Sequence, residues 1–376
     1  MVSQAPNRGS GPGLAGDVLL IFMPTPDAGY SWPDAGWIAA TEARYPGLQV
    51  RWLPQKDPAT GKPRTPEELP AEVWEGVTLL CSSWAPPARL IPHVRFIQAP
   101  SAGADRWLLH EAYKDPRVTL CTGNGTHATQ IAEWVIGVWL MWRHRFLAFA
   151  EHMKTGSGFE KQDAHDVLES TGSRVGILGY GAIGRQVARL CTGLGMEVYA
   201  YTRTERATAE ARRDESFRVP NTGDPAGELP ARWFHGSDAA ALNGFLAQDL
   251  DLLVVAAPLT AVTTGLLNTE QFAVLGHRPA STYVVNVARG PVVDTAALMT
   301  ALESGQIAGA ALDVTDPEPL PADHALWKAP NVFITPHVSW QSQKRWGRAL
   351  EMLELNLQRM AAGEPLVNVV NKEHNY

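Results

Sequence analysis

Short apolar runs alternate with longer polar or amphipathic stretches along the first third of the chain. Spacing of this kind is typical of parallel strands joined by crossover helices. The strands predicted in this part are 18–22, 48–53, 77–80, 94–98 and 118–121. From about 127 to 149 the pattern becomes helical and is rich in tryptophan. The first third therefore predicts a parallel sheet that is followed by a Trp-rich helix.

A second series of apolar runs starts at Arg174 and is more regular. Its predicted strands are 174–178, 196–201, 251–255, 282–286, 309–313 and 332–335. The segments after the first and the fourth of these strands have helical periodicity. In the later segment, Asp294 is suited to an N-cap and Gly305 to a C-cap. Six parallel strands that begin at a glycine-rich turn predict a Rossmann domain.

Two further segments complete the predicted organisation. The stretch 204–236 is rich in Arg, Glu, Pro and Gly without a firm period, so we expect a mobile surface insertion. After Trp340, an amphipathic helix would return the chain to the first domain. The predicted fold class is α/β, with two Rossmann-like domains that contain parallel sheets. The cofactor domain, 127–338, is inserted into a discontinuous flavodoxin-like substrate-binding domain made of 1–126 and 339–376.

Composition narrows the function classes. At 376 residues the chain is longer than a single core usually reaches, which supports two domains. The formal net charge is −7, and the tight basic cluster at 344–348 lies on a predicted helix, so we expect no nucleic-acid partner. The longest apolar run, 131–142, carries Glu133 and is shorter than the roughly 20 residues that cross a bilayer. We therefore expect no membrane contact.

The cysteines Cys81, Cys121 and Cys191 are odd in number and widely spaced. This pattern argues against a disulfide framework and a zinc site, and it is typical of reducing compartments. We expect buried thiols, no metal and a cytoplasmic location.

The sequence RVGILGYGAIG places three glycines between a predicted strand and a predicted helix. In a dinucleotide site, Gly179 permits the tight turn, Gly181 lets the backbone approach a pyrophosphate, and Gly184 allows the helix to pack closely on the strand. The pattern alone is also compatible with an ordinary strand–helix turn. The preceding strand and the helical spacing of apolar residues after Ile183 favour the dinucleotide site.

The end of the next strand is where the adenosine ribose is expected. NAD-specific sites place an acidic residue there, but this strand ends Thr202, Arg203, Thr204. Thr202 can donate a hydrogen bond, and Arg203, with Arg206 nearby, can pair with a 2′-phosphate that a carboxylate would repel. We therefore expect NADP(H) to be preferred over NAD(H). The alternative is that Arg203 simply points into water.

Arg289, Glu318 and His337 follow predicted strands further along the chain. The guanidinium of Arg289 can bind a substrate carboxylate and polarise the adjacent carbonyl. His337 can protonate the carbonyl oxygen as a hydride arrives, and Glu318, if paired with it, favours the imidazolium. Each of the three alone is more often a solvated side chain, a loop carboxylate or a turn residue. Together, at the ends of strands in one Rossmann half, they predict a catalytic set.

At these residues the chain resembles the D-isomer-specific 2-hydroxyacid dehydrogenase family, which includes glyoxylate and hydroxypyruvate reductases. The matching motifs are LGYGAIG, VVAAPLT at 254–260, NVARGPVVD at 286–294, GAALDVTDPEPLP at 309–321 and NVFITPH at 331–337. They cover most of 174–337 in the family's order. The first 125 residues match mainly through pattern and through SAGAD at 101–105.

The resemblance implies further site residues and a homodimer through the Trp-rich helix. It implies that Asp313 binds the nicotinamide carboxamide, with a helix or turn cap as the alternative role. Backbone contacts to the pyrophosphate and the lining of the cofactor would come from Ala182, Ile183, Ala257, Pro258, Thr263, Val287 and Ala288. Backbone N–H groups around Ala102 and Gly103 would hold the substrate carboxylate, unless the glycine only serves a tight turn.

Two tryptophans bear on the substrate. Members of the resembled family usually have small residues after the catalytic His, where this chain has Ser339 and Trp340. Trp84 lies in a loop that in the family often touches the substrate. Either indole can narrow the pocket or stack on a larger substituent, or it can be core packing.

The sequence thus predicts an enzyme, an NADPH-preferring reductase that converts 2-oxo acids such as glyoxylate, hydroxypyruvate or a larger homologue into D-2-hydroxy acids. Formate dehydrogenase has glutamine at the position of Glu318 and is disfavoured. Phosphite dehydrogenase keeps all three residues and is excluded only by rarity and by the weak N-terminal match. The alternative from another class is a non-enzymatic dimer that senses dinucleotides, like the C-terminal-binding-protein corepressors. Those proteins bind NAD(H) through an acidic residue that this chain lacks.

Overall fold

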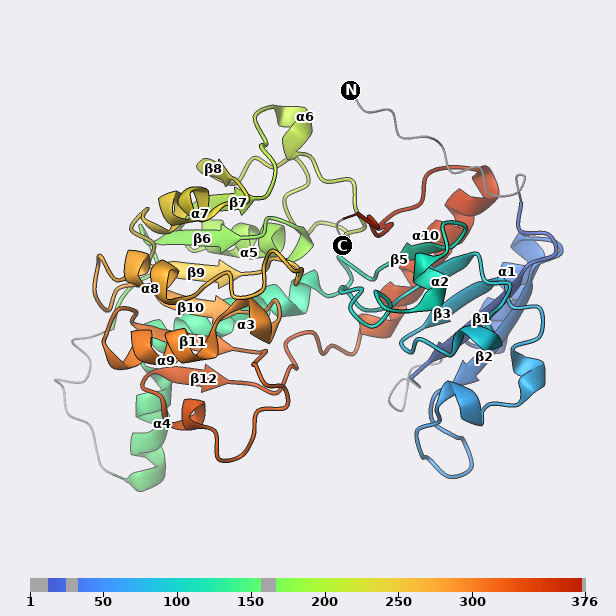
Figure 1. The fold of residues 1–376 in the computed structure, drawn as a ribbon, viewed down its shortest axis with the longest axis horizontal. Coiled ribbons are helices and arrows are strands. Elements are labelled where there is room, and N and C mark those ends of the chain that lie inside the picture. Colours follow the sequence, from blue (N-terminus) through green and yellow to red (C-terminus); the bar gives the residue numbers. More distant parts are fainter. Residues whose placement is uncertain (1–12, 25–32, 157–166, 374–376) are drawn as a thin grey trace. The chain divides into compact units, whose positions relative to one another are not determined.

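The computed structural model describes residues 13–24, 33–156 and 167–373. The chain divides into two compact units (Figure 1). The first contains 1–126 and 342–376, and the second contains 127–341. Each unit has its own parallel sheet and its own hydrophobic core.

The first unit is built on a five-stranded parallel sheet with the order β2-β1-β3-β4-β5. Its strands are β1 Val18–Met23, β2 Gln49–Pro54, β3 Leu79–Ser82, β4 Phe96–Gln98 and β5 Thr119–Cys121. Its helices are α1 Ala35–Arg44, α2 Glu111–Lys114 and α10 Arg345–Ala362. All five strands lie where the apolar runs predicted them, to within two residues at each end, and their order is that of flavodoxin-like sheets.

Both faces of this sheet are buried. On one face, Leu353 of the amphipathic helix α10 belongs to the same cluster as Leu19 and Ile21 of β1. On the other face, Leu20 packs in a cluster that contains Trp107. Successive residues of β1 therefore face opposite cores, as expected for a parallel strand that is covered on both sides.

The second unit contains a seven-stranded parallel sheet with the order β12-β11-β10-β9-β6-β7-β8. Its strands are β6 Arg174–Leu178, β7 Glu197–Thr202, β8 Arg232–His235, β9 Leu252–Val255, β10 Tyr283–Asn286, β11 Gly309–Leu312 and β12 Val332–Ile334. Its helices are α3 Ala128–Arg143, α4 Phe146–Thr155, α5 Ala182–Gly193, α6 Ala209–Arg212, α7 Ala239–Leu246, α8 Thr269–Leu275 and α9 Thr295–Glu303. The strand order reverses between β6 and β9, which is the Rossmann pattern. The predicted fold class is confirmed.

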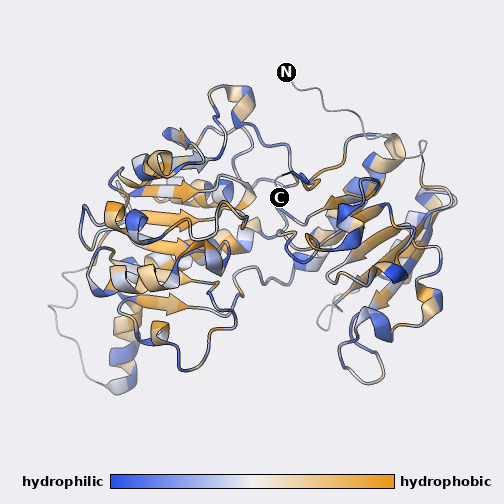
Figure 2. Cartoon of the chain, viewed as in Figure 1, coloured by the Kyte–Doolittle hydropathy of each residue, from blue (hydrophilic) through white to orange (hydrophobic). Residues whose placement is uncertain are grey.

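Helices cover both faces of the seven-stranded sheet (Figure 1). α3 and α5 pack on one face, and α7, α8 and α9 pack on the other. Figure 2 shows apolar residues concentrated in the strands and polar residues spread over the helices and loops. Asp294 caps α9 as predicted, by accepting a hydrogen bond from the N–H of Ala297. Gly305 follows the C-cap Ser304 with φ +69°, one residue beyond its expected place.

The stretch 204–236, for which we expected a mobile surface insertion without regular structure, is regular in part. It contains α6 and the edge strand β8, which pairs in parallel with β7. Within it, Asp224 is only 5% exposed and accepts hydrogen bonds from the backbone N–H groups of residues 227–229. The stretch is therefore part of the domain, and the sheet has seven strands where six were predicted.

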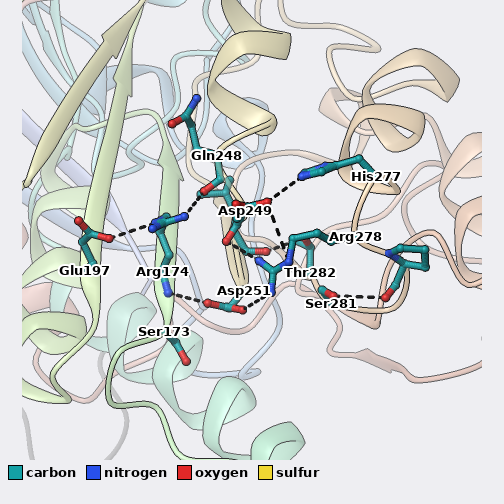
Figure 3. A network of polar contacts seen from close by, with 12 residues as sticks. Ser173, Arg174, Glu197, Gln248, Asp249, Asp251, His277, Arg278, Ser281 and Thr282 are labelled. Atoms are coloured by element: carbon teal, nitrogen blue, oxygen red, sulfur yellow. Dashed lines mark hydrogen bonds and ion pairs between the residues drawn. The ribbon is translucent and has the colours of Figure 1, made fainter.

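Charged residues tie neighbouring strands together at the amino-terminal edge of the same sheet (Figure 3). Arg174, which starts β6, donates to Glu197 at the start of β7 and to the carbonyl of Gln248. The backbone N–H of Arg174 also donates to Asp251, which precedes β9. This network lies at the opposite end of the strands from the glycine turn, so its role is to stabilise the sheet.

The three cysteines are buried and free, which confirms their predicted place in the cores. Within the described ranges, no helix is long and apolar enough to span a membrane.

Candidate active site

The carboxyl ends of the strands in the second unit carry the predicted chemistry. The glycine turn follows β6, Thr202 ends β7, Arg289 follows β10 and His337 follows β12. Because parallel strands all end at the same edge of their sheet, these groups share one edge. In open α/β sheets this edge binds ligands, at the point where the strand order reverses.

Each glycine of the turn has the geometry that its predicted role requires. Gly179 has φ +102°, and an added Cβ would lie 2.7 Å from the backbone of the loop after β9. Gly181 is the N-cap of α5, with open space where a Cβ would stand. At Gly184 a Cβ would collide with the carbonyl of Gly179, so the helix sits as close to the turn as the backbone allows. The open helix N-terminus, with the backbone amides of Ala182 and Ile183, fits a pyrophosphate.

The end of β7 presents a cation, and residues 202–204 include no carboxylate. The side chain of Arg203 is exposed. The hydroxyl of Thr202 donates to the carbonyl of Thr204 over 2.8 Å, so its proton is used within the turn. Arg206 donates to the carbonyl of Ala211 over 2.6 Å, which closes a short loop. Arg203 follows the last residue of the strand directly.

Thr263 closes the loop that follows β9. Its hydroxyl donates to the carbonyl of Pro258 over 2.7 Å and accepts from the N–H of Thr260, also over 2.7 Å. Ala257 on this loop is buried, as are Val287 and Ala288 after β10. The contacts of these residues with a cofactor stay a prediction.

A residue that the sequence reasoning missed shapes the turn of Arg289. Asn286 is 1% exposed, donates from Nδ2 to the carbonyl of Arg289 and accepts from the N–H of Ala288, each over 3.0 Å. The guanidinium of Arg289 donates to the carbonyl of Ala288 over 2.8 Å. Gly290 lies so close to the carbonyl of Thr315 that a Cβ would not fit. Asparagine at a strand end is a turn signal, which could have pointed to this role.

Glu318 and His337 form the pair that their chemistry requires. Nδ1 of His337 lies 2.7 Å from Oε1 of Glu318. The imidazole is 35% exposed and the carboxylate is 41% exposed. A carboxylate at Nδ1 fixes the proton on that nitrogen and the orientation of the ring. Nε2 is then the atom through which the imidazole can exchange a proton with a substrate.

The backbone of His337 is left-handed, with φ +54°, and Asp313 holds the turn around it. The N–H of His337 donates to the carbonyls of Asp313 and Thr335. The carboxylate of Asp313, which is 2% exposed, accepts hydrogen bonds from the Thr335 hydroxyl, the Val338 N–H, and the N–H and hydroxyl of Ser339. Asp313 therefore caps this turn. Its contact with the nicotinamide stays a prediction.

Trp340 packs within the second unit. Its Nε1 donates to the carbonyl of His337 over 2.8 Å, and its ring meets that of His127 edge-on at 6.0 Å between centroids. Its carbonyl accepts from Nε2 of Gln130 over 2.8 Å, and the side chain packs partly buried against the cluster around α3 and α5. These contacts favour the packing role for Trp340 and make it a support for the His337 turn.

Ala102, Gly103 and Trp84 belong to the first unit. Arg106 donates to the carbonyl of Ser83 over 3.2 Å, which joins the loop at 101–105 to the loop that carries Trp84. Trp84 is 40% exposed and is therefore not a core residue. The two loops thus present a backbone turn and an exposed indole on the same unit.

The family model described as "D-isomer specific 2-hydroxyacid dehydrogenase, NAD binding domain" matches residues 136–221 and 234–339. The matched ranges contain the glycine turn, Arg289, Glu318 and His337. The chain belongs to this dehydrogenase family. It is an NAD(P)-dependent oxidoreductase that acts on CH–OH donors, and the predicted family and enzyme class are confirmed.

Similarity to members of the family extends beyond that domain. The glyoxylate reductase of Thermofilum pendens is 32% identical over 285 residues, which are 75% of this chain and 76% of that protein. A family member from Xanthobacter autotrophicus, solved with NADPH and MES, is 30% identical with a TM-score of 0.68 and covers 97% of this chain and 100% of its own. The NADPH-dependent glyoxylate/hydroxypyruvate reductase of Sinorhizobium meliloti, solved with NADP and sulfate, is 26% identical with a TM-score of 0.69, at 96% and 100% coverage.

Proposed function

We propose that this dehydrogenase is an NADPH-preferring reductase of 2-oxo acids, such as glyoxylate, hydroxypyruvate or a larger homologue, and that it forms D-2-hydroxy acids. The proposal rests on the 2.7 Å contact between His337 and Glu318, at the sheet edge that also carries Arg289 and the glycine turn. In this proposal, 127–341 binds the cofactor and the other unit binds the substrate.

In the proposed reaction, one residue binds and polarises the substrate and another transfers the proton. A reduced nicotinamide, when bound, supplies the hydride that reaches the substrate carbon. Arg289 binds the substrate carboxylate and polarises the neighbouring carbonyl. Nε2 of His337 gives its proton to the carbonyl oxygen, and Glu318 stabilises the positive charge that the ring holds before the transfer. In the reverse direction, Nε2 accepts the proton of the hydroxyl.

The preference for NADPH is supported by the strand end after β7. A cofactor without the 2′-phosphate gains nothing from Arg203, whereas a phosphate pairs with a guanidinium through charge-assisted hydrogen bonds. Two relatives were solved with NADPH or NADP. A panel of 2-oxo acids, assayed with each cofactor, tests the proposal. We expect kcat/KM with NADPH to exceed that with NADH by about tenfold or more, which is the contribution of one hydrogen bond between a guanidinium and a phosphate.

Replacing His337 by glutamine tests the catalytic role. Glutamine keeps a hydrogen-bonding side chain but carries no transferable proton, so kcat is expected to fall about 10²- to 10⁴-fold. Binding of NADPH, followed by fluorescence, is expected to stay unchanged. A variant with the wild-type kcat would refute the role of His337. A wild-type protein that binds NADPH but reduces no 2-oxo acid would instead support the dinucleotide sensor.

We also propose a cytoplasmic homodimer that forms through α3 and α4. On α4, Phe146, Leu147 and Met153 are 54%, 50% and 82% exposed, and an apolar patch on a helix is typical of an interface. The free, buried cysteines are compatible with a reducing compartment. Sedimentation equilibrium tests the assembly, since a particle of one chain would contradict it.

A further inference from the structure

The connection between β7 and β8 begins at the residue expected to recognise the 2′-phosphate. Arg203 follows β7 directly, and the chain reaches β8 at Arg232. Neighbouring parallel strands are joined by right-handed crossovers, so this connection lies on the same face of the sheet as α5, which joins β6 to β7. Residues 222–233 fall between the two ranges that match the family model. The family model therefore does not match this part of the connection.

A buried carboxylate fastens the connection to the glycine turn. Asp224 is 5% exposed, and it accepts three backbone N–H bonds from residues 227–229 over 3.0 to 3.1 Å. Its fourth donor is the hydroxyl of Tyr180, 2.7 Å from Oδ2. Tyr180 stands between Gly179 and Gly181 and is itself 4% exposed. Burial raises the pKa of the Tyr180 phenol, so its hydroxyl keeps its proton and donates throughout the neutral range.

A buried guanidinium fastens the same connection to α5 at two points. Arg185, which is 5% exposed, donates to the carbonyl of Asp224 over 2.5 Å and to the carbonyl of Arg212 over 2.7 Å. Its guanidinium also lies over the ring of Tyr180, 5.0 Å from the centroid. Nε of Arg185 is 3.6 Å from Oδ2 of Asp214. Both halves of the connection are therefore held to the helix that begins at the glycine turn.

The fixed part of the connection reaches almost to Arg203. Nε of Arg212 donates to the carbonyl of Arg206 over 2.8 Å, and Nη1 of Arg206 donates to the carbonyl of Ala211 over 2.6 Å. The loop from 206 to 212 is thus closed on itself and anchored through Arg212 to α5. Only two residues separate Arg203 from this loop.

We propose that Tyr180, Asp224 and Arg185 are positioning residues that fix the connection after β7 and thereby hold Arg203 in place for the 2′-phosphate of NADPH. The inference rests on the proposed NADPH preference. The cluster does not include Arg289, Glu318 or His337, so its expected effect is on the discrimination between the two cofactors.

Tyr180→Phe tests the inference, because it removes one hydroxyl and leaves the ring in place. We expect the Kd of NADPH to rise about tenfold, the size of a lost hydrogen bond to a charged group, and the Kd of NADH to change less than about threefold. The kcat at saturating NADPH is expected to stay within about twofold. Asp224→Asn is the second variant, and Tyr199→Phe, which makes the same chemical change in the first half of β7, is the matched control.

Trypsin cleavage of the connection gives a readout without activity. Wild-type protein is expected to be cut slowly within 203–218 and to be protected by NADPH more than by NADH, whereas Tyr180→Phe and Asp224→Asn are cut faster. Equal losses of affinity for both cofactors, or none, would overturn the inference, because the cluster would then only stabilise the domain. Arg203→Ala separates the two proposals. If Arg203→Ala leaves the ratio of the Kd of NADH to the Kd of NADPH unchanged, the proposed NADPH preference through Arg203 fails. If Arg203→Ala lowers this ratio while Tyr180→Phe does not, only the inference about the positioning residues fails.

Discussion

Replacing Asp313 by asparagine tests whether a buried charge holds the turn that carries His337. The two oxygens of Asp313 accept hydrogen bonds from four donors on Thr335, Val338 and Ser339. Asparagine has the same shape but offers one acceptor oxygen and an amide nitrogen that faces donors. At the oxygen that becomes nitrogen, the hydroxyl can turn and accept from the amide, but the backbone N–H loses its acceptor and stays buried.

The magnitude follows from the burial and the charge. Asp313 is 2% exposed, so solvent does not replace the lost partners. A hydrogen bond to a charged group contributes about 1.5–3 kcal/mol, so the loss of the one backbone N–H bond costs about that much. For a cooperative unit of this size, that is a decrease in Tm of about 3–12 °C.

The same change is expected to slow the reaction. A left-handed backbone costs a non-glycine residue about 1–2 kcal/mol, so His337 relaxes from φ +54° once its cap is lost. A displacement of the imidazole by about 1 Å lowers kcat about 10²-fold. Thermal unfolding by circular dichroism and steady-state kinetics measure the two effects. Ser339→Ala, which removes one donor, is expected to give a smaller decrease in Tm, and Asp323→Asn, at an exposed acid, is the control.

A wild-type Tm together with a wild-type kcat in Asp313→Asn would refute this reasoning. Unchanged Tm and kcat with weaker binding of NADPH would point elsewhere. That result would assign Asp313 to the nicotinamide carboxamide, the role that the family resemblance implies, and not to the turn.

Two further substitutions test the packing and the amino-terminal edge of the same unit. Gly290→Ala is expected to lower both Tm and kcat, because the added Cβ meets the carbonyl of Thr315 and overpacking costs about 1–3 kcal/mol. Gly244→Ala is the control, and it is expected to keep the wild-type Tm and kcat because the space around its added Cβ is open. His277→Ala removes an imidazole whose pKa is raised by its hydrogen bonds to Asp249 (Figure 3) and to the carbonyl of Val274. This stabilisation is complete below the ordinary pKa of about 6.5 and is lost as the pH rises through the higher folded value, so the Tm difference between wild type and variant shrinks from pH 6 to pH 9. A difference that grows with pH would contradict the assignment.

The strands could be predicted from the sequence wherever they are buried on both faces. β6 and β9 are such strands, and their apolar runs are almost continuous. β8 is an edge strand, Arg232–His235, with no fully buried residue. A half-exposed strand of polar and aromatic residues has no apolar run, so the pattern that found the other strands could not find this one.

The candidate site could be predicted only as far as residue type and strand ends reach. The sequence predicts Arg289, Glu318 and His337, because each has a reactive or charged side chain after a predicted strand. It does not predict the roles of Asp224 and Ser339, because their partners lie far along the chain: 44 residues separate Asp224 from Tyr180, and 26 separate Ser339 from Asp313. Periodicity carries no information about such contacts, and a hydroxyl or carboxylate in a loop looks the same whether it is solvated or buried.

The buried polar residues around the predicted catalytic side chains share a physical task, which explains why they surround them. A catalytic or binding side chain at a strand end stands on irregular backbone, where no ladder of hydrogen bonds fixes its direction. His337 in its left-handed turn and Arg289 beside a glycine are such positions. Asp313 for the first and Asn286 for the second supply the missing hydrogen bonds from buried side chains. Precision at this edge therefore comes from buried polar groups at the strand ends, and substitutions there are expected to reduce kcat before they unfold the protein.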